Sequence, residues 1–103
     1  MNKWIFHVQG SAAVPYVVTF EKIIEHIKVT CDCPAGLRGK LCKHKLGILT
    51  ENIKNNTDLG RELVNDGYND SLAELTNCEV SIKQLNDEMA RLKKVLANKM
   101  KNN

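Results

Sequence analysis

Four residues of metal-ligand type fall within fourteen consecutive positions of this 103-residue chain. Cys31 and Cys33 form a C-x-C pair, and Cys42 and His44 form a C-x-H pair after eight intervening residues. Thiolate and imidazole are preferred ligands of Zn²⁺, and four of them complete the tetrahedral shell of a structural site. The spacing therefore predicts that these four side chains bind one structural Zn²⁺.

The two short spacings also limit where each ligand pair can lie. In an extended segment, residues i and i+2 point to the same side, so Cys31 and Cys33 can reach one ion from the end of a strand. In a helix the same two positions lie about 200° apart. Cys42 and His44 must therefore lie where the chain enters a helix, with Cys42 at or before its cap. The segment between the two pairs is predicted to be a loop, because it contains Pro34, Gly36 and Gly39.

Two other interpretations of the cysteines are weaker. A set of reduced cysteines near a surface histidine would not require such close spacing with turn residues in between. A disulfide is disfavoured because C-x-C pairing is strained. The N-terminal apolar run also breaks at His7 without forming a secretory signal. We therefore expect a cytoplasmic protein, in which a cysteine cluster is more typical of metal binding than of disulfide bonding.

Short β-forming runs precede the ligand cluster, and helical patterns follow it. Apolar side chains alternate at Tyr16, Val18 and Phe20, which is typical of a half-buried strand. The stretch 21–25 contains no Gly or Pro that would mark a turn, so its structure is ambiguous. The predicted strands cover residues 4–9, 15–20 and 26–31. One predicted helix begins close to Cys42 and runs to about residue 54, and a second, capped by Thr57, runs through residue 64.

The order of these features resembles the SWIM zinc finger. The resemblance rests on the C-x-C and C-x-H pairs, on Cys33-Pro-Ala-Gly and on Lys40-Leu-Cys42-Lys-His44-Lys-Leu, and it covers about residues 4–50. It implies a β-β-α fold, zinc binding by the four ligand-type residues, and binding of DNA or protein. Members of this family occur beside helicases, transposases and ubiquitin ligases, and alone in small prokaryotic proteins. Here a helical tail stands in place of a catalytic partner domain.

The C-terminal third carries a seven-residue repeat that is typical of a coiled coil. We expect one helix over residues 71–100, with Ser71 and Glu74 as a capping box at its start. The seam could pair with itself, pair with another protein or fold back on the first helices, and self-association is the interpretation we favour. The predicted oligomerisation residues are Leu75, Cys78, Ile82, Leu85, Met89, Leu92 and Leu96.

Charge is distributed unevenly along the chain. Residues 1–56 carry a net +4, residues 57–81 a net −5 and residues 82–103 a net +4. The predicted C-terminal helix therefore begins acidic and ends basic, which favours an antiparallel homodimer. Basic side chains also surround the ligand cluster, and they could bind nucleic acid or could simply keep a loop solvated. These candidate nucleic-acid-binding residues are Arg38, Lys40, Lys43 and Lys45.

Together these patterns predict an α+β protein. We expect a small zinc-stabilised β-β-α finger at residues 1–56, a linker with a short helix at 57–70, and a coiled-coil helix at 71–103. A closed four-ligand site leaves no position for an activated water, so we expect no catalytic residues and no small-molecule substrate. No membrane partner is expected either, because no run is long and apolar enough to span a bilayer.

Two functions fit this organisation. The first is a zinc-binding, non-catalytic DNA-binding or DNA-associated accessory protein that oligomerises through its C-terminal helix. The alternative is a protein-protein interaction adaptor or regulator, of phage or bacterial type, in which zinc is purely structural. The two differ in how binding should respond to salt and to loss of the basic side chains.

Overall fold

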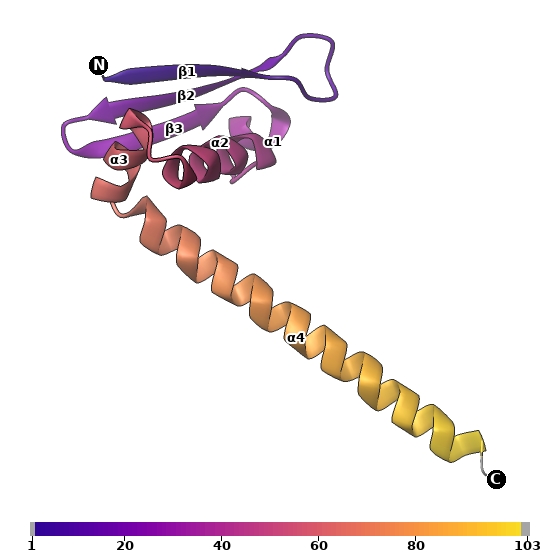
Figure 1. Cartoon of the computed structure of the whole chain (residues 1–103). Helices are drawn as coiled ribbons and strands as arrows, with labels where there is room; N and C mark the ends of the chain where they lie inside the picture. The colour runs from indigo at the N-terminus through magenta and orange to yellow at the C-terminus, as the bar shows by residue number, and fades with distance from the viewer. Residues whose placement is uncertain (1, 102–103) are drawn as a thin grey trace. The chain divides into compact units, whose positions relative to one another are not determined.

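The computed structural model describes residues 2–101, which contain one antiparallel sheet of strand order β1-β2-β3 and four helices (Figure 1). The chain divides into a first compact unit that ends at Asn69 and a second that begins at Asp70. Within residues 2–101, no helix combines the length and the apolar character that crossing a membrane requires. The elements are β1 (Lys3–Val8), β2 (Tyr16–Ile23), β3 (His26–Cys31), α1 (Pro34–Leu37), α2 (Lys43–Lys54), α3 (Asp58–Asn65) and α4 (Tyr68–Lys101).

The sheet has one buried face and one open face. Val18 and Phe20 of β2 are both 0% exposed, and Ile27 of β3 is 1% exposed. Phe6 of β1 packs edge-on against Phe20, with 5.8 Å between the ring centroids. The alternation predicted for the strands is confirmed, and the sheet has three strands rather than the two implied by a β-β-α finger.

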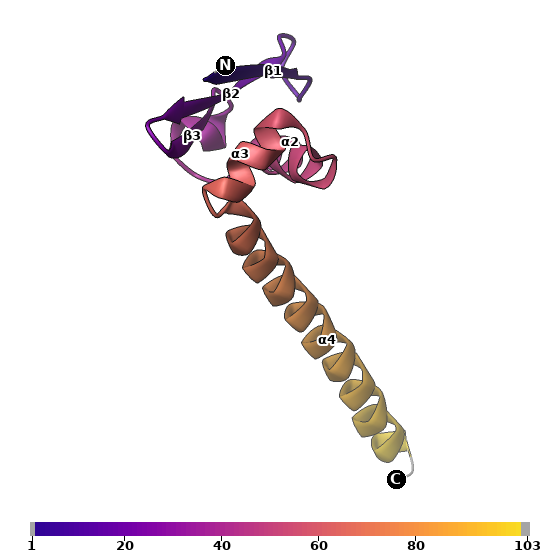
Figure 2. The ribbon, with the colours of Figure 1, turned by 60° about the vertical axis from the view of Figure 1, so that its left-hand side comes forward.

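The helices of the first unit cover the buried face of the sheet, as the two views in Figures 1 and 2 show. Leu49 of α2 and Leu59 and Leu63 of α3 complete the core, and the two leucines of α3 are almost fully buried. The segment 57–70 thus contributes core side chains to the first unit through α3. Lys22 of β2 and Glu62 of α3 form a 2.7 Å ion pair between the sheet and this helix.

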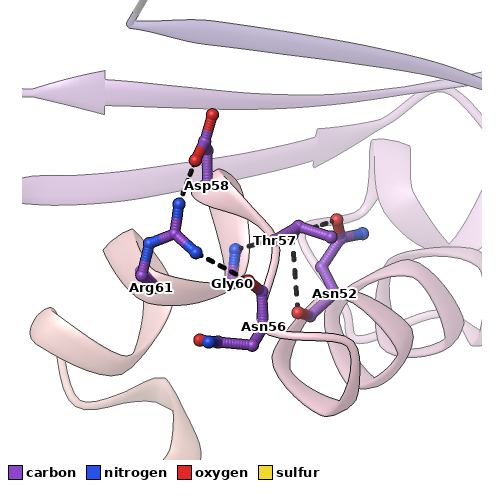
Figure 3. A network of polar contacts seen from close by, with 6 residues as sticks. All are labelled: Asn52, Asn56, Thr57, Asp58, Gly60 and Arg61. Atoms are coloured by element: carbon purple, nitrogen blue, oxygen red, sulfur yellow. Dashed lines mark hydrogen bonds and ion pairs between the residues drawn. The ribbon is translucent and has the colours of Figure 1, made fainter.

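Helices α2 and α3 begin and end within one residue of their predicted bounds. The Thr57 hydroxyl accepts a 3.0 Å hydrogen bond from the amide of Gly60, which caps α3 (Figure 3). The same hydroxyl donates to the side-chain oxygen of Asn52 at 2.7 Å and so joins α3 to α2. A Cβ atom at Gly60 would lie 2.0 Å from the carbonyl oxygen of Asn52, so only glycine allows this close approach. Arg61 adds a 2.7 Å hydrogen bond to the carbonyl oxygen of Asn56.

Two predictions about local structure are wrong. Residues 34–37 form a single helical turn, α1, instead of an irregular loop. Helix α4 begins at Tyr68, directly after Gly67 with its positive φ of 85°, so Ser71 lies inside the helix and cannot cap it.

The second unit consists of most of α4. None of the residues of α4 is buried, and this includes its apolar heptad positions. Exposure of the large apolar heptad residues ranges from 37% at Leu75 to 66% at Leu85. An apolar stripe of this length on a charged helix is typical of a seam that pairs with another helix.

Candidate metal centre

The structure brings the four ligand-type side chains together. One ligand atom from each of Cys31, Cys33, Cys42 and His44 lies within 4.8 Å of the others. The three cysteines are 4%, 3% and 7% exposed, and His44 is 9% exposed. Cys31 ends β3, Cys33 and Cys42 are the N-cap residues of α1 and α2, and His44 is the second residue of α2. The centre therefore lies where one strand and two helix N-termini meet.

The two capping thiols take the place of the usual oxygen caps. The Sγ atom of Cys33 accepts a 3.3 Å hydrogen bond from the amide of Gly36, and that of Cys42 accepts one of the same length from the amide of Lys45. These bonds satisfy backbone donors that the first turn of a helix leaves free. The position of Cys42 at the cap agrees with the limit set by the C-x-H spacing.

Gly36 lets α1 approach the end of β3. A Cβ atom at this position would lie 2.2 Å from the carbonyl oxygen of Cys31 and 2.9 Å from the Cys31 Cβ atom. No other residue fits without moving the backbone. The glycine, which the sequence marks only as a turn former, thus places the thiol of Cys33 beside that of Cys31.

The local environment shifts the acidities of two of the thiols in opposite directions. The hydrogen bond from the Gly36 amide lowers the pKa of Cys33 to about 6. Burial raises the pKa of Cys31 to about 11. Thiolates are the metal-binding form of cysteine, and a bound cation deprotonates a coordinating thiol. A divalent ion would therefore supply the charge that stabilises the Cys31 thiolate in its buried position.

His44 is held in place by residues from the start of β2 and the loop before it. Its Nδ1 atom lies 3.9 Å from the Sγ atom of Cys31. Its Nε2 atom is buried and, within residues 2–101, has no hydrogen-bond partner. The ring of Tyr16 packs against the imidazole with 4.9 Å between centroids, and a Cβ atom at Gly10 would lie 3.3 Å from Nε2. Neither residue is among the sequence-predicted site residues, because their contacts join segments about thirty positions apart.

The chemical types of the four donor atoms, and the distances between them, fit a tetrahedrally coordinated metal ion. Ligand atoms around Zn²⁺ with Zn–S bonds of about 2.3 Å lie about 3.8 Å apart, so small inward shifts would close the observed cage on an ion. Thiolate and imidazole donors favour zinc or another borderline-soft metal over calcium or magnesium. The cluster is therefore a possible metal-binding site of the kind found in zinc fingers.

The predicted basic residues lie between the two ligand pairs and at the start of α2. Arg38 follows α1, Lys40 lies in the loop before α2, and Lys43 and Lys45 alternate with the ligands at the start of α2. The Nζ atom of Lys45 donates a 3.3 Å hydrogen bond to the carbonyl oxygen of Lys40. Within the part of the chain that the structure describes, none of these four side chains forms an ion pair. Their charge is therefore available beside the metal centre.

The predicted oligomerisation residues lie apart from the metal centre in the sequence and belong to α4. They are exposed, as described above, and Cys78 among them lies outside the ligand cluster. Comparison of the chain with protein-family models, with curated proteins and with solved structures found no match. The geometry of the cluster is compatible with a zinc finger, and the resemblance to the SWIM zinc finger in particular rests on the residue pattern alone.

Proposed function

We propose that the protein is a zinc-dependent, non-catalytic DNA-binding or DNA-associated accessory protein. The observation that carries this proposal is a set of basic side chains between and beside the candidate ligands, none of which forms an ion pair with another described residue. Positive side chains are common phosphate contacts, and such contacts give sequence-independent affinity. The proposed contacts are Arg38, Lys40, Lys43 and Lys45.

The proposed metal is a single Zn²⁺ bound by Cys31, Cys33, Cys42 and His44, with a structural role. Zinc binding by small domains supplies roughly 10–16 kcal/mol. This is comparable to the whole stability of an ordinary domain, about 5–15 kcal/mol. Zinc would fix the positions of the basic side chains by holding the starts of α1 and α2 against the end of β3. Four protein ligands leave no open position for an activated water, which is why the proposed role is not catalytic.

The proposal includes self-association through α4. A second copy of the chain would cover the apolar seam, and charge complementarity favours an antiparallel pair. Asp70, Glu74 and Glu79 lie in the first half of the helix, and the net charge of the last twenty-two residues is +4. Like charges would meet in a parallel pair and opposite charges in an antiparallel one. One register sets Leu75 against Leu92, Cys78 against Met89 and Ile82 against Leu85.

Pairing would also strengthen binding to nucleic acid. A dimer presents two basic centres, and two weak contacts in one assembly gain affinity when both engage the same duplex. A monomer with four unpaired positive charges would bind only weakly at physiological salt.

The proposal is tested by fluorescence anisotropy of labelled duplex and single-stranded DNA, from low to physiological salt. We expect binding that weakens as salt rises, and that is reduced in the Lys40/Lys43/Lys45→Ala variant. The matched control is Lys93/Lys94/Lys99→Ala, which removes the same charge from α4. Light scattering must show that this variant keeps the oligomeric state of the unchanged protein, because these lysines also contribute to the proposed antiparallel charge match. If both variants lose affinity equally, net charge rather than the metal centre causes the binding.

A protein adaptor is the second candidate, and the exposed seam of α4 is the observation that favours it. Another protein could cover this seam with a helix of its own, and zinc would then serve only to shape the first unit. Failure of both DNA forms to bind at low salt, together with a monomeric zinc-loaded protein in light scattering, would favour the adaptor over the DNA-binding proposal.

A further inference from the structure

The outer face of α2 has lysines at its two ends and a glycine, Gly47, between them. Lys43, Gly47, Thr50, Glu51 and Lys54 are all exposed and are spaced along one side of the helix, opposite the buried side chain of Leu49. Together with the half-buried Leu46 and the exposed Asn55, they line a shallow hollow on the protein surface.

Gly47 creates this hollow, and the fold of the first unit does not require it. A Cβ atom at this position would meet nothing within 4 Å, and the backbone does not have a positive φ. Glycine in the middle of a helix is markedly less favourable than alanine. At Gly60, by contrast, the approach of the neighbouring helix excludes any side chain. Packing of the core therefore does not explain the glycine at position 47, and we look for its role on the exposed surface of α2.

The charges and the length of this face suit a nucleic-acid groove. Among the described residues, Lys43 and Lys54 form no ion pair, and they stand at the two ends of α2. Eleven residues of helix separate them by about 16 Å. The major groove of B-DNA is about 12 Å wide and admits an α-helix. Lysines at both ends of the helix can thus reach the phosphates on the two walls of the groove.

The side chains between the two lysines are of the types that contact base edges. A threonine methyl group can contact the thymine methyl group, a glutamate can accept from the cytosine amino group, and an asparagine can bond to adenine. Thr50, Glu51 and Asn55 place these groups on or beside the exposed face. A glycine in the same stripe lets the helix backbone come close to the bases.

We propose that the outer face of α2 lies in the major groove of duplex DNA, with Gly47 toward the base edges. This inference rests on the proposed DNA binding and adds the surface, the element and the form of nucleic acid. It places α2 in the groove while the residues before it, Arg38 and Lys40, contact the adjoining phosphates. Lys45 is half-buried and lies about 200° around the helix from Lys43, so it does not face the groove in this arrangement. Duplex DNA should therefore bind more tightly than a single strand of the same length.

The test uses the full-length zinc-loaded protein and a short labelled duplex of mixed sequence, by fluorescence anisotropy. Gly47→Leu adds a large side chain to the outer face with no clash in the first unit. It should weaken duplex binding by about tenfold or more, because the helix can no longer approach the bases closely. Zinc content and circular dichroism should be unchanged. Ala73→Leu adds the same side chain to an exposed position of α4 and should leave the affinity unchanged.

A smaller substitution at the same position separates the effect of side-chain size on DNA binding from its effect on protein stability. Gly47→Ala should raise the melting temperature by a few degrees, because alanine favours a helix, while it lowers affinity by no more than about threefold. Full affinity in Gly47→Leu, with a normal salt response, would overturn the placement of α2 and leave the proposed DNA binding intact. Failure of the unchanged protein to bind any DNA at low salt would overturn both.

Discussion

The hydroxyl group of Tyr68 donates a 2.6 Å hydrogen bond to the carbonyl oxygen of Ile27, forty-one residues earlier in the chain. The Oδ2 atom of Asp66 accepts a 2.9 Å hydrogen bond from the amide of the same Ile27, and it also pairs with His26 at 3.0 Å. Both backbone polar groups of Ile27 are therefore satisfied, the amide by Asp66 after α3 and the carbonyl oxygen by Tyr68 at the start of α4. This protects the outer edge of β3 from pairing with another strand at that residue.

Loss of the Tyr68 hydroxyl should destabilise the first unit. Tyr68→Phe leaves the carbonyl oxygen of Ile27 without its partner, which should lower the free energy of unfolding by about 1 kcal/mol. The expected fall in melting temperature is about 4–8 °C at neutral pH. Thermal melts of the zinc-loaded protein followed by circular dichroism measure this difference, and equal melting temperatures would contradict it.

The difference in stability between the unchanged protein and Tyr68→Phe should depend on pH. Burial, and then the charge of Asp66, raise the pKa of Tyr68 above its ordinary value in the folded protein. The native state therefore holds the phenol proton more tightly than the unfolded state does. Its contribution to stability is present below the unfolded pKa of about 10 and is lost as pH rises through the folded pKa. The gap between the unchanged protein and Tyr68→Phe should narrow above about pH 10, and a constant gap would rule out this linkage.

Metal removal should unfold the first unit. Because two of the ligands cap helices and all four lie at the core edge, a strong chelator should abolish the cooperative thermal transition of this unit. Cys33→Ser should have the same effect, with less than one equivalent of zinc retained. The control is Cys78→Ser, which changes a cysteine outside the cluster and should keep one zinc per chain. A thermal transition of Cys33→Ser equal to that of the unchanged protein would contradict a structural role of the metal.

Alanine should have opposite effects at two glycines of neighbouring helices. Gly60→Ala should lower the free energy of unfolding by about 2 kcal/mol or more, because the new methyl group would overlap the backbone of Asn52. Gly47→Ala should raise it by about 1 kcal/mol, since the added group meets open space and favours the helix. Urea unfolding monitored at several protein concentrations measures both values. Changes of the same sign would show that helix packing in this unit differs from the described structure.

If α4 pairs with a second copy of the chain as proposed, a charge in its seam should dissociate the dimer. Leu85→Lys places a positive charge on the apolar stripe and should yield a monomer at micromolar concentration in analytical ultracentrifugation, because pairing would bury that charge. Gln84→Lys adds the same charge at the next position, on a different side of the helix, and should remain a dimer. Rapid and specific Cys78–Cys78 crosslinking under mild oxidation would show a parallel seam, against the antiparallel arrangement.

Much of the fold can be predicted from local signals in the sequence. The alternation around Val18 and Phe20 identifies β2, and the Thr57 cap before Leu59 and Leu63 identifies α3. These predictions are confirmed because a strand or helix that buries one face needs apolar side chains at regular intervals, and this spacing is visible in the sequence. The ligand spacing likewise predicts which side chains converge, since two-residue steps restrict each pair to a strand end or a helix entry.

The features that escape prediction depend on contacts between distant segments. The turn between β2 and β3 contains no glycine, and Ile24 adopts a positive φ of 59° that is unusual for a β-branched residue. Sheet pairing on both sides of this turn imposes that conformation. The local pattern predicts too late a start for α4, because the helix start depends on hydrogen bonds from Asp66 and Tyr68 to β3. Local sequence does not indicate these bonds. The packing of Tyr16 on His44 depends on the same kind of long-range approach.

Cys33 and Cys42 cap two helices, and their proposed use as metal ligands would link the amount of folded protein to the supply of metal. A ligand that binds only the native state stabilises it in proportion to the logarithm of its free concentration. When zinc is scarce, the proposed site would empty, both helix starts would lose their anchor, and the chain would become a substrate for proteases. The abundance of such a protein would then follow zinc availability without any separate sensor, and zinc-starved cells would clear it by ordinary turnover.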